Sequence, residues 1–231
     1  MKIKRLLIIP ARSGSKRIKN KNIKNFVGKP MIYYPISTAI KSKLFTKIHV
    51  STNSKKISKL AESFGVMSDF LRPKNLSNDK ATLFPVFKFV VNKYFLLGQK
   101  FDEVWCILPC SPFLDKNDLV SISIKSKKLK KPILTISPYP APLNWSFEVK
   151  KHRVMNVNQK KMRNDKLSKK KHFYDAGQVY CLPSNYLNKK NFNFKDNIST
   201  YELPLVKSVD IDTIHDWKLA DTIYRGLHFK K

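Results

Sequence analysis

Short runs of apolar residues alternate along the chain with longer segments in which apolar residues recur every three or four positions. The short runs predict buried strands, and the longer periodic segments predict helices that cover a sheet. The expected strands, all short and mostly apolar, are residues 5–9, 47–52, 66–71, 103–109 and 132–139. The expected helices, all with helical spacing of apolar residues, are residues 30–43, 54–65, 83–98 and 116–129.

Residues with known preferences for helix ends support several of these helices. Pro30 suits the first position of a helix, because that position needs no backbone N–H donor. Ser54 is a typical N-cap, and Gly65 is typical of the residue that ends a helix. Near the C-terminus, residues 207–227 predict a short strand followed by a helix that Thr213 caps.

The regular alternation of strands and helices predicts an α/β fold with a mainly parallel sheet and helices on both of its faces. In such sheets, ligands bind beyond the carboxyl ends of the strands. The 231 residues suffice for a single domain. The alternation breaks at residues 138–174, which are rich first in proline and aromatic residues and then in basic residues, and it resumes at residues 176–183. We interpret 138–174 as an extended arm or insert.

Composition narrows the class of protein. Hydrophobic residues make up 42% of the chain, which argues against intrinsic disorder. No apolar run approaches the roughly 18 residues that span a bilayer, and Leu6–Ile9 is too short for a signal peptide, so we expect a cytoplasmic protein without a membrane partner. The three cysteines, Cys106, Cys110 and Cys181, are too few and too poorly spaced for a disulfide framework or a zinc site. Buried, inert thiols are the simpler interpretation.

The formal net charge of +30 raises the possibility of a nucleic-acid-binding protein. Lysine is spread over the whole chain, however, together with many Asn, Ile, Phe and Tyr residues, and a biased codon usage produces the same composition. The chain contains no recognisable recognition helix, zinc finger or RNP-like aromatic motif. Charge alone therefore does not distinguish a polyanionic partner from biased codon usage. Because the recognition motifs are missing, we expect no specific nucleic-acid partner.

A basic loop follows the first expected strand in the segment "IIPARSGSKRIKNKN", residues 8–22. The small residues 13–15 allow the backbone to approach an anion, and successive N–H groups in such a turn form an anion-binding nest. Arg12 can bind a phosphate through two donors, whereas Lys21 acts as a point charge. The loop matches neither the GxxxxGK[ST] nor the GxGxxG motif. Its position after the strand nevertheless favours a nucleotide-phosphate site over a merely solvated loop.

The segment "VDID", residues 209–212, supplies two carboxylates in a chain that is poor in acidic residues. Asp210 and Asp212 project to the same face of an extended segment, so both can bind one cation. Mg²⁺, or Mn²⁺ in its place, suits such a site because it binds through one or two carboxylates together with substrate phosphates. The alternative is an acidic turn that caps the following helix. The basic loop and the acidic pair together predict phosphoryl or nucleotidyl transfer.

Six motifs in this order, "IIPARSGSKRIKNKN", "GKPMIYYPI", "VSTNS", "FLRPKNLSND", "SPFL" and "VDIDT", resemble the acylneuraminate cytidylyltransferase family, the CMP–sialic acid synthetases. The resemblance covers almost the whole chain. It implies a Rossmann-like nucleotide-diphospho-sugar transferase fold, with CTP and a small acidic sugar as substrates. It also implies a homodimer in which an insert reaches into the active site of the partner, and residues 138–174 fit that insert.

The resemblance also implies roles for individual residues. Arg12, Ser15 and Lys21 would bind the triphosphate, and Asn22, Arg72, Asp79, Ala81 and Thr82 match positions around the cytidine. Asp210 and Asp212 would bind the metal, and Arg12, Lys21 and Asp212 would be catalytic, with a carboxylate or its water taking the proton from the anomeric hydroxyl of the sugar. Simpler roles stay open for two of them, since Asn22 suits a turn and Arg72 precedes a proline.

Further positions point to one branch of the family. Leu108, in "LPCSPFL", replaces a glutamine that is usual in enzymes for ordinary sialic acid, and "YPAPLNWSFEV" and "YDAGQVY" look like the branch that acts on pseudaminic acid. Leu108, Ser111, Asp175 and Gln178 would then contact the sugar, although Asp175 could instead cap a loop. Sialic, legionaminic and 3-deoxy-octulosonic acids remain alternative substrates. Asn53 stands where an acid is common, which keeps open an inactive relative with a binding role.

Overall fold

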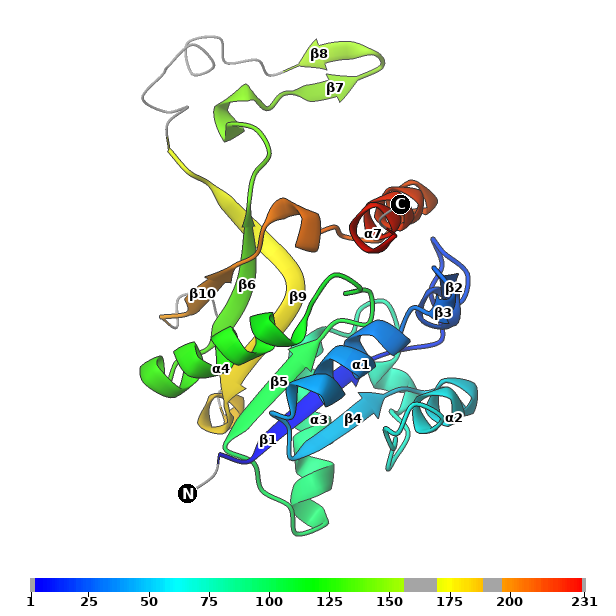
Figure 1. Cartoon of the computed structure of the whole chain (residues 1–231), viewed down its shortest axis with the longest axis vertical. Helices are drawn as coiled ribbons and strands as arrows, with labels where there is room; N and C mark the ends of the chain where they lie inside the picture. Colours follow the sequence, from blue (N-terminus) through cyan, green and yellow to red (C-terminus); the bar gives the residue numbers. More distant parts are fainter. Residues whose placement is uncertain (1–2, 156–169, 189–196, 230–231) are drawn as a thin grey trace.

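The structure is a computed structural model, and it describes residues 3–155, 170–188 and 197–229. Its centre is a six-stranded sheet with the strand order β10-β6-β9-β5-β1-β4 (Figure 1). The strands are β1 Arg5–Pro10, β4 Lys47–Ser51, β5 Glu103–Ile107, β6 Ile133–Pro138, β9 Phe173–Pro183 and β10 Ser199–Glu202. β1 runs parallel to both β4 and β5, and β10 runs parallel to β6, whereas β9 is antiparallel to its two neighbours. The predicted α/β fold with a mainly parallel sheet is confirmed.

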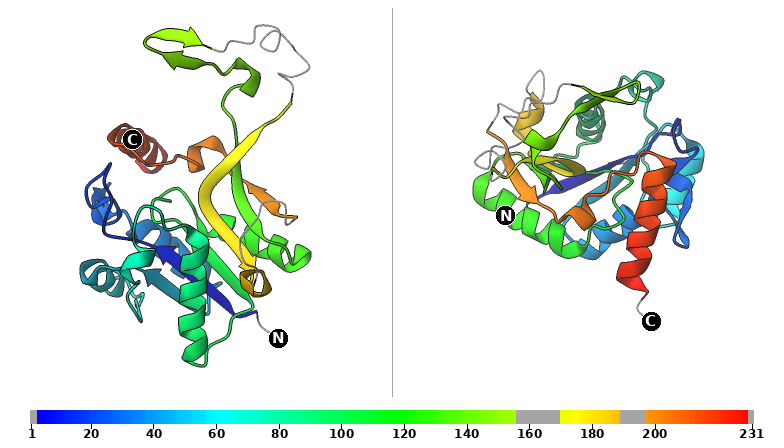
Figure 2. Two further views of the ribbon diagram at one scale, coloured as in Figure 1. Left: turned by 180° about the vertical axis from the view of Figure 1, so that it is seen from behind. Right: turned by 90° about the horizontal axis from the view of Figure 1, so that it is seen from above.

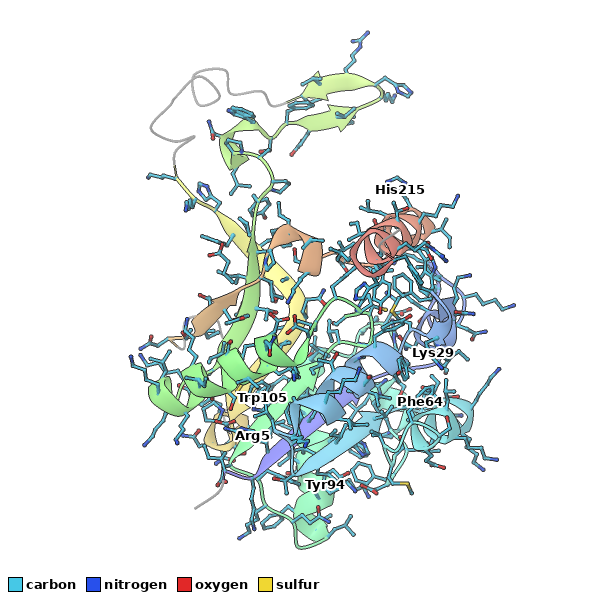
Figure 3. The ribbon with its side chains drawn as sticks, viewed as in Figure 1. Arg5, Lys29, Phe64, Tyr94, Trp105 and His215 are labelled. Atoms are coloured by element: carbon cyan, nitrogen blue, oxygen red, sulfur yellow. The ribbon has the colours of Figure 1, made fainter. Side chains whose placement is uncertain are left out.

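Helices cover both faces of this sheet, as predicted. They are α1 Tyr33–Ser42, α2 Lys55–Glu62, α3 Leu83–Leu96 and α4 Lys116–Leu129, and a further helix, α7 Ile214–His228, lies outside these two layers. Because alternate residues of a strand point to opposite faces, Leu7 of β1 packs in one core cluster with α1, α2 and α4, and Leu6 packs in another with α3. Trp105 and Tyr94 lie in these two clusters, on opposite faces of the sheet (Figure 3).

A third core cluster forms beside the carboxyl ends of the strands. It packs α7, through Trp217 and Ala220, against the antiparallel ribbon of β2 (Asn25–Phe26) and β3 (Lys29–Pro30). Ile18 of the basic loop and Ile211 of the acidic segment are both buried in this cluster. Their packing brings together two segments that lie far apart in the sequence.

The helix-end signals are partly confirmed. Ser54 accepts a hydrogen bond from the Ile57 N–H at 3.4 Å, and Thr213 forms a capping box with Asp216 at the start of α7. Pro30, in contrast, belongs to β3, and α1 begins at Tyr33, so its predicted position inside the helix is wrong.

Two of the expected strands are wrong, and one strand of the central sheet was missed, as were the short strands of the two hairpins. Residues 66–71, all of them described, form no strand. The Ser68 hydroxyl donates to the Val50 carbonyl of β4, and the N–H of the following Arg72 donates to the Thr52 carbonyl just after β4, so the segment lies beside β4 without the regular backbone hydrogen bonds of paired strands. The segment 207–212 forms no strand either, since its first residue ends the short 3₁₀ helix η5, Leu205–Lys207. The edge strand β10 was missed because it is short and half-exposed.

The remaining short elements connect the main ones. The 3₁₀ helices are η1 Lys21–Ile23, η2 Lys74–Leu76, η3 Leu143–Trp145 and η4 Ser184–Asn188. Cys106 and Cys181 are buried and free, as predicted, while the free Cys110 is partly exposed. No helix within the described ranges has the length and apolar content that crossing a membrane requires.

The segment predicted as an arm extends away from the helices that cover the sheet (Figures 1 and 2). It leaves the end of β6, passes through η3, and forms a hairpin of β7 (Glu148–Lys150) and β8 (Arg153–Met155). β9 then brings the chain back into the sheet. Residues 156–169, which belong to the expected arm and contain many of its basic residues, lie outside the described residues.

Candidate active site

A cavity of about 510 Å³ opens beyond the carboxyl end of β1, where the α/β fold predicts a ligand site. The residues that line it are Pro10, Arg12, Ser15, Lys16, Arg17, Ile18, Lys21, Asn22, Asp79, Pro109 and Asp212. Six of the residues predicted from the sequence therefore meet in one cavity, namely Arg12, Ser15, Lys21, Asn22, Asp79 and Asp212. Four cations and two carboxylates line it, which makes the cavity electropositive.

Hydrogen bonds within the basic loop, to β4 and to the residue Asn53 just beyond it fix the shape of the loop. The Ala11 N–H donates to the Ser51 carbonyl at 2.9 Å, and the Asn22 side chain donates to the Arg12 carbonyl at 2.9 Å. The Asn53 amide oxygen accepts from the Ser13 N–H at 3.0 Å. An amide oxygen thus makes this contact at the position where an acid is common, and the contact needs no negative charge.

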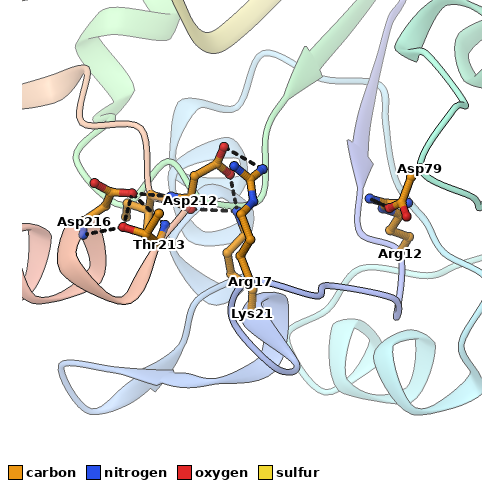
Figure 4. Close-up of polar contacts among 8 residues, drawn as sticks. Arg12, Arg17, Lys21, Asp79, Asp212, Thr213 and Asp216 are labelled. Atoms are coloured by element: carbon orange, nitrogen blue, oxygen red, sulfur yellow. Dashed lines mark hydrogen bonds and ion pairs between the residues drawn. The ribbon is translucent and has the colours of Figure 1, made fainter. Parts of the chain in front are cut away.

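Arg12 binds Asp79 on one wall of the cavity (Figure 4), and Lys16 binds the same carboxylate. Arg12 Nη2 lies 2.6 Å from Asp79 Oδ1, and Lys16 Nζ lies 2.7 Å from Asp79 Oδ2. These two cations, Lys16 above all, hold the pKa of the Asp79 carboxyl below its usual range. Asp79 therefore keeps two basic side chains in place at the mouth of the cavity.

The opposite wall joins the basic loop to the acidic segment (Figure 4). Asp212 accepts from Lys21 Nζ at 3.1 Å and lies 2.8 Å from Arg17 Nη2. Lys21 also donates to the Ile211 carbonyl at 2.7 Å, across 190 residues of sequence. Lys16 and Arg17 were not assigned roles from the sequence, although they belong to the same basic loop.

Asp210 is the second carboxylate of the acidic segment. Loss of part of its hydration and repulsion from Asp212 raise the pKa of the Asp210 carboxyl. Cys110 lies beside the same groups, and loss of hydration around its thiol raises the thiol's pKa to about 11 while Lys21 opposes that effect. The sequence indicated an inert cysteine, and nothing in its spacing could have placed Cys110 beside Lys21.

The acidic segment fits a divalent cation that also binds phosphate. Its two carboxylates are the hard oxygen donors that Mg²⁺ prefers, and burial and repulsion from Asp212, which raise the pKa of Asp210, are costs that a cation beside it would offset. Among the described residues, no group of three or more His, Cys, Asp or Glu side chains could hold a metal ion. The remaining ligands would therefore have to come from water and from a bound substrate.

Arg72 lies close to the cavity without lining it. Its side chain is buried, and Nε and Nη2 have no hydrogen-bond partner among the described residues. Burial and the nearby charge of Arg12 lower the pKa of Arg72 to about 10. A buried, unpaired guanidinium is costly, so an anion or a carbonyl-rich ligand beside Arg72 would be bound favourably. Ala81 and Thr82 lie at the start of α3 and do not line the cavity.

The residues predicted to contact a sugar form a second group, around a bulge in β9. The register between β6 and β9 shifts at residues 176–179, where Gly177 has a φ of +60°. Such a bulge re-aims side chains beside a site. Asp175 accepts from the Gly177 N–H at 2.9 Å and from the Tyr180 hydroxyl at 2.8 Å, so it caps this turn while its carboxylate remains exposed.

The other members of this group lie beside the bulge. The Gln178 side chain is buried and donates to the Ala176 carbonyl at 3.1 Å. A Cβ on Gly177 would lie 3.8 Å from Leu108 Cδ1, so Leu108 covers the bulge. The Ser111 hydroxyl is buried and has no partner among the described residues. Only Pro109, between Leu108 and Ser111, reaches the lining of the cavity, and sugar contacts by this group stay a prediction.

A mainly parallel α/β sheet with a basic loop after its first strand, and Asp212 bound to two cations of that loop, is the arrangement expected of a nucleotidyltransferase. The family model described as Cytidylyltransferase matches residues 6–227. The chain belongs to this family, as the resemblance implied.

Curated relatives agree over the full length. The chain is 32% identical over 228 residues to a pseudaminic acid cytidylyltransferase of Campylobacter jejuni, covering 98% of each chain. It is 28% identical to a CMP-N,N'-diacetyllegionaminic acid synthase of Legionella pneumophila, covering 94% of this chain and 95% of the relative. The solved structure of a CMP:2-keto-3-deoxy-manno-octonic acid synthetase complexed with CTP superposes with a TM-score of 0.74 at 16% identity, covering 97% of this chain and 99% of the other. That likeness supports the Rossmann-like fold.

Proposed function

We propose that this cytidylyltransferase transfers CMP from CTP to the anomeric hydroxyl of a nonulosonic acid, with pseudaminic acid as the substrate. The main observation behind this proposal is that Arg12, Lys21 and Asp212 line one cavity at the carboxyl end of β1. The identity of 32% over 98% of the chain to the pseudaminic acid cytidylyltransferase of Campylobacter jejuni supports the sugar. The need for CTP supports the cytoplasmic location expected from the sequence.

The basic loop binds the triphosphate. In the structure, Arg12 and Lys21 are paired with Asp79 and Asp212, which keep the two cations near their working positions. Phosphate oxygens replace the carboxylates when CTP enters, so the cations exchange one set of oxygen partners for another. Arg12 and Lys21 then stabilise the charge that grows on the α-phosphate and on the departing pyrophosphate. The N–H groups near Ser15 add neutral donors.

The cytidine lies towards Arg72 and residues 79–82. Arg72 has two donor atoms without partners, and a base or ribose oxygen would satisfy them. Asn22 contributes indirectly, because its side chain donates to the Arg12 carbonyl and so fixes the loop that holds the nucleotide.

Asp210 and Asp212 would hold Mg²⁺, or Mn²⁺, together with phosphate oxygens. A bound divalent cation would neutralise phosphate charge and draw the nucleophile and the α-phosphate together. Once Lys21 and Arg17 turn to the phosphates, a carboxylate of this pair can accept the proton of the anomeric hydroxyl. The deprotonated oxygen attacks the α-phosphate in line, and the products are the CMP-sugar and pyrophosphate.

The sugar binds beside the bulge of β9. Leu108 offers an apolar surface there instead of an amide, which favours a deoxygenated or acylated part of the sugar over a hydroxyl-rich part. Asp175 is held by Gly177 and Tyr180 and still exposes its carboxylate, so it can accept hydrogen bonds from N–H or O–H groups of the sugar.

The arm supports a homodimer. Large apolar side chains on η3 and on the hairpin are between 36% and 64% exposed, namely Leu143, Trp145, Phe147, Val149, Val154 and Met155. A second copy would bury this surface, as isolated hairpins are unstable in water. Sedimentation equilibrium should give a dimer for the wild type. A monomer at micromolar concentration would contradict this assignment.

The test of the function is pyrophosphate release with CTP and Mg²⁺, measured with pseudaminic, legionaminic and N-acetylneuraminic acids in parallel. We expect turnover with pseudaminic acid and loss of turnover in Asp212→Asn. A matched control is Asp221→Asn, which removes a carboxylate paired with Arg225 on the surface of α7. Turnover with another acid alone would contradict pseudaminic acid as the substrate and would still support CMP transfer as the reaction. A folded wild type that is inactive with all three acids would contradict the proposal.

A nucleic-acid-binding protein remains the alternative of another class, and only the charge of +30 favours it. A salt titration of DNA binding discriminates the two, because incidental charge gives weak, site-independent binding that falls steeply with salt.

A further inference from the structure

The acidic segment is anchored to helix α4 from its preceding side. Lys207 binds Asp115 and Asp118 at the N-terminal turn of α4, at 2.7 Å each. From the following side, Ile211 is fully buried in the cluster that contains α7. Asp210 lies between these anchors, and its position depends on the residues that hold the backbone before it.

Ser208 provides a further contact just before the acidic pair. Its side chain is almost completely buried, and its hydroxyl lies 2.8 Å from Ser137 Oγ and 3.0 Å from the Tyr174 hydroxyl. Ser137 is also buried, and it donates to the Leu203 carbonyl at 3.1 Å. Ser208 Oγ also lies 3.0 Å from the Leu205 carbonyl, so its single proton is shared between that carbonyl and Ser137 Oγ, while its lone pairs can accept from the Tyr174 hydroxyl. The three hydroxyls form one connected chain of contacts.

The two partners of Ser208 lie on the strands that lead into the arm. Ser137 is near the end of β6, and Tyr174 is near the start of β9 (Figure 1). Ser208, which directly precedes the acidic segment, thus contacts both of these strands. The chain of hydroxyls is therefore a lateral attachment of the backbone just before the acidic pair to the base of the arm.

We propose that Ser208 is a positioning residue, which holds the acidic pair at the spacing and orientation that a metal–nucleotide complex requires. The proposal rests on the proposed function in assigning Asp210 and Asp212 to a divalent cation. Without the hydroxyl, Tyr174 loses its acceptor and Ser137 loses its donor, so residues 208–210 lose their attachment to both strands. Groups that orient ligands in this way typically change metal affinity by about 10- to 100-fold when they are removed.

The test separates binding of the metal from binding of the nucleotide. CTP affinity is measured by isothermal titration calorimetry with and without Mg²⁺, and the ratio of the two affinities reports the contribution of the metal. Ser208→Ala should reduce this ratio by about tenfold and leave the metal-free affinity unchanged. Ser126→Ala is the matched control, because Ser126 is equally buried and hydrogen-bonded but lies on α4, bound to Glu103. It should keep the wild-type ratio.

Tyr174→Phe removes only the first hydroxyl of the chain, and it should reduce the ratio less, in the same direction. Tyr174→Phe also tests the positioning role of Ser208 if Ser208→Ala fails to fold. Wild-type ratios in folded Ser208→Ala and Tyr174→Phe would overturn the proposal, and so would a wild type without any gain from Mg²⁺. The calorimetry needs no sugar, so a wild type that turns over no sugar acid refutes the proposed function separately.

Discussion

The buried histidine of β4 should make the stability of this protein fall on mild acidification. His49 is fully buried, with Nδ1 3.0 Å from the Tyr94 hydroxyl and its ring stacked on Phe70 at 4.5 Å. The Tyr94 hydroxyl also donates to Asp69, which Lys47 binds at 2.7 Å. Burial, opposed by Asp69 and reinforced by Lys47, lowers the pKa of His49 to about 4.

The magnitude follows from the difference between the folded and unfolded states. The pKa of His49 is about 4 in the folded protein and 6.5 in an unfolded chain, so the unfolded state binds the proton first as the pH falls. The stabilising contribution is complete above pH 6.5 and is lost as the pH falls towards 4. Linkage predicts that this group alone lowers the free energy of unfolding by about 2 kcal/mol between pH 7 and pH 5.

The assay is urea denaturation at pH 7, 6 and 5, at one protein concentration, for the wild type and for His49→Phe. Phenylalanine keeps the stacking on Phe70 and removes the titration, so the decrease in unfolding free energy should be smaller in the variant by about 2 kcal/mol. His215→Phe, on the exposed face of α7, is the control and should follow the wild type (Figure 3). Equal decreases in the wild type and in His49→Phe would refute the reasoning.

Three further predictions concern the site. Asp212→Asn and Arg12→Ala should each abolish pyrophosphate release in a protein that unfolds at the wild-type temperature, and full activity in either would remove that residue from the site. Asn53→Asp should keep activity within about threefold, because a carboxylate also accepts from the Ser13 N–H, whereas Asn53→Leu should raise KM for CTP about tenfold through loss of that bond. Arg72→Met should raise KM for CTP without lowering the urea midpoint, since it removes a buried cation with unpaired donors; a large loss of stability would indicate a structural arginine.

The sequence predicted those parts of the fold that depend on local pattern. β1, β5 and α4 are continuous apolar runs or well-spaced helical faces, and they lie where they were expected. The direction of β9 could not be predicted, because an apolar run is the same read in either direction. Residues 66–71 have the apolar content of a strand. They are held beside β4 by the Ser68 side chain and by the backbone of Arg72, and not by the backbone hydrogen bonds that pair two strands.

The site was predictable as two separate motifs and not as an arrangement. The basic loop and the acidic pair were recognisable from residue type and spacing. Their ion pair between Lys21 and Asp212 depends on the packing of Ile18 and Ile211 in one cluster, which no local pattern reveals. The same is true of Cys110, whose position beside Lys21 is a property of the folded chain.

The position of β9 has a consequence for the order in which the chain can fold. β9 lies between β5 and β6, although it follows both in the sequence and is separated from them by the arm. During synthesis, β4, β1 and β5 can pair early, while β5 and β6 each keep an open edge until residues 173–183 leave the ribosome. Open edges invite wrong pairing between chains. The slow, error-prone step of folding should therefore be the late insertion of β9, and chains that end before it should aggregate.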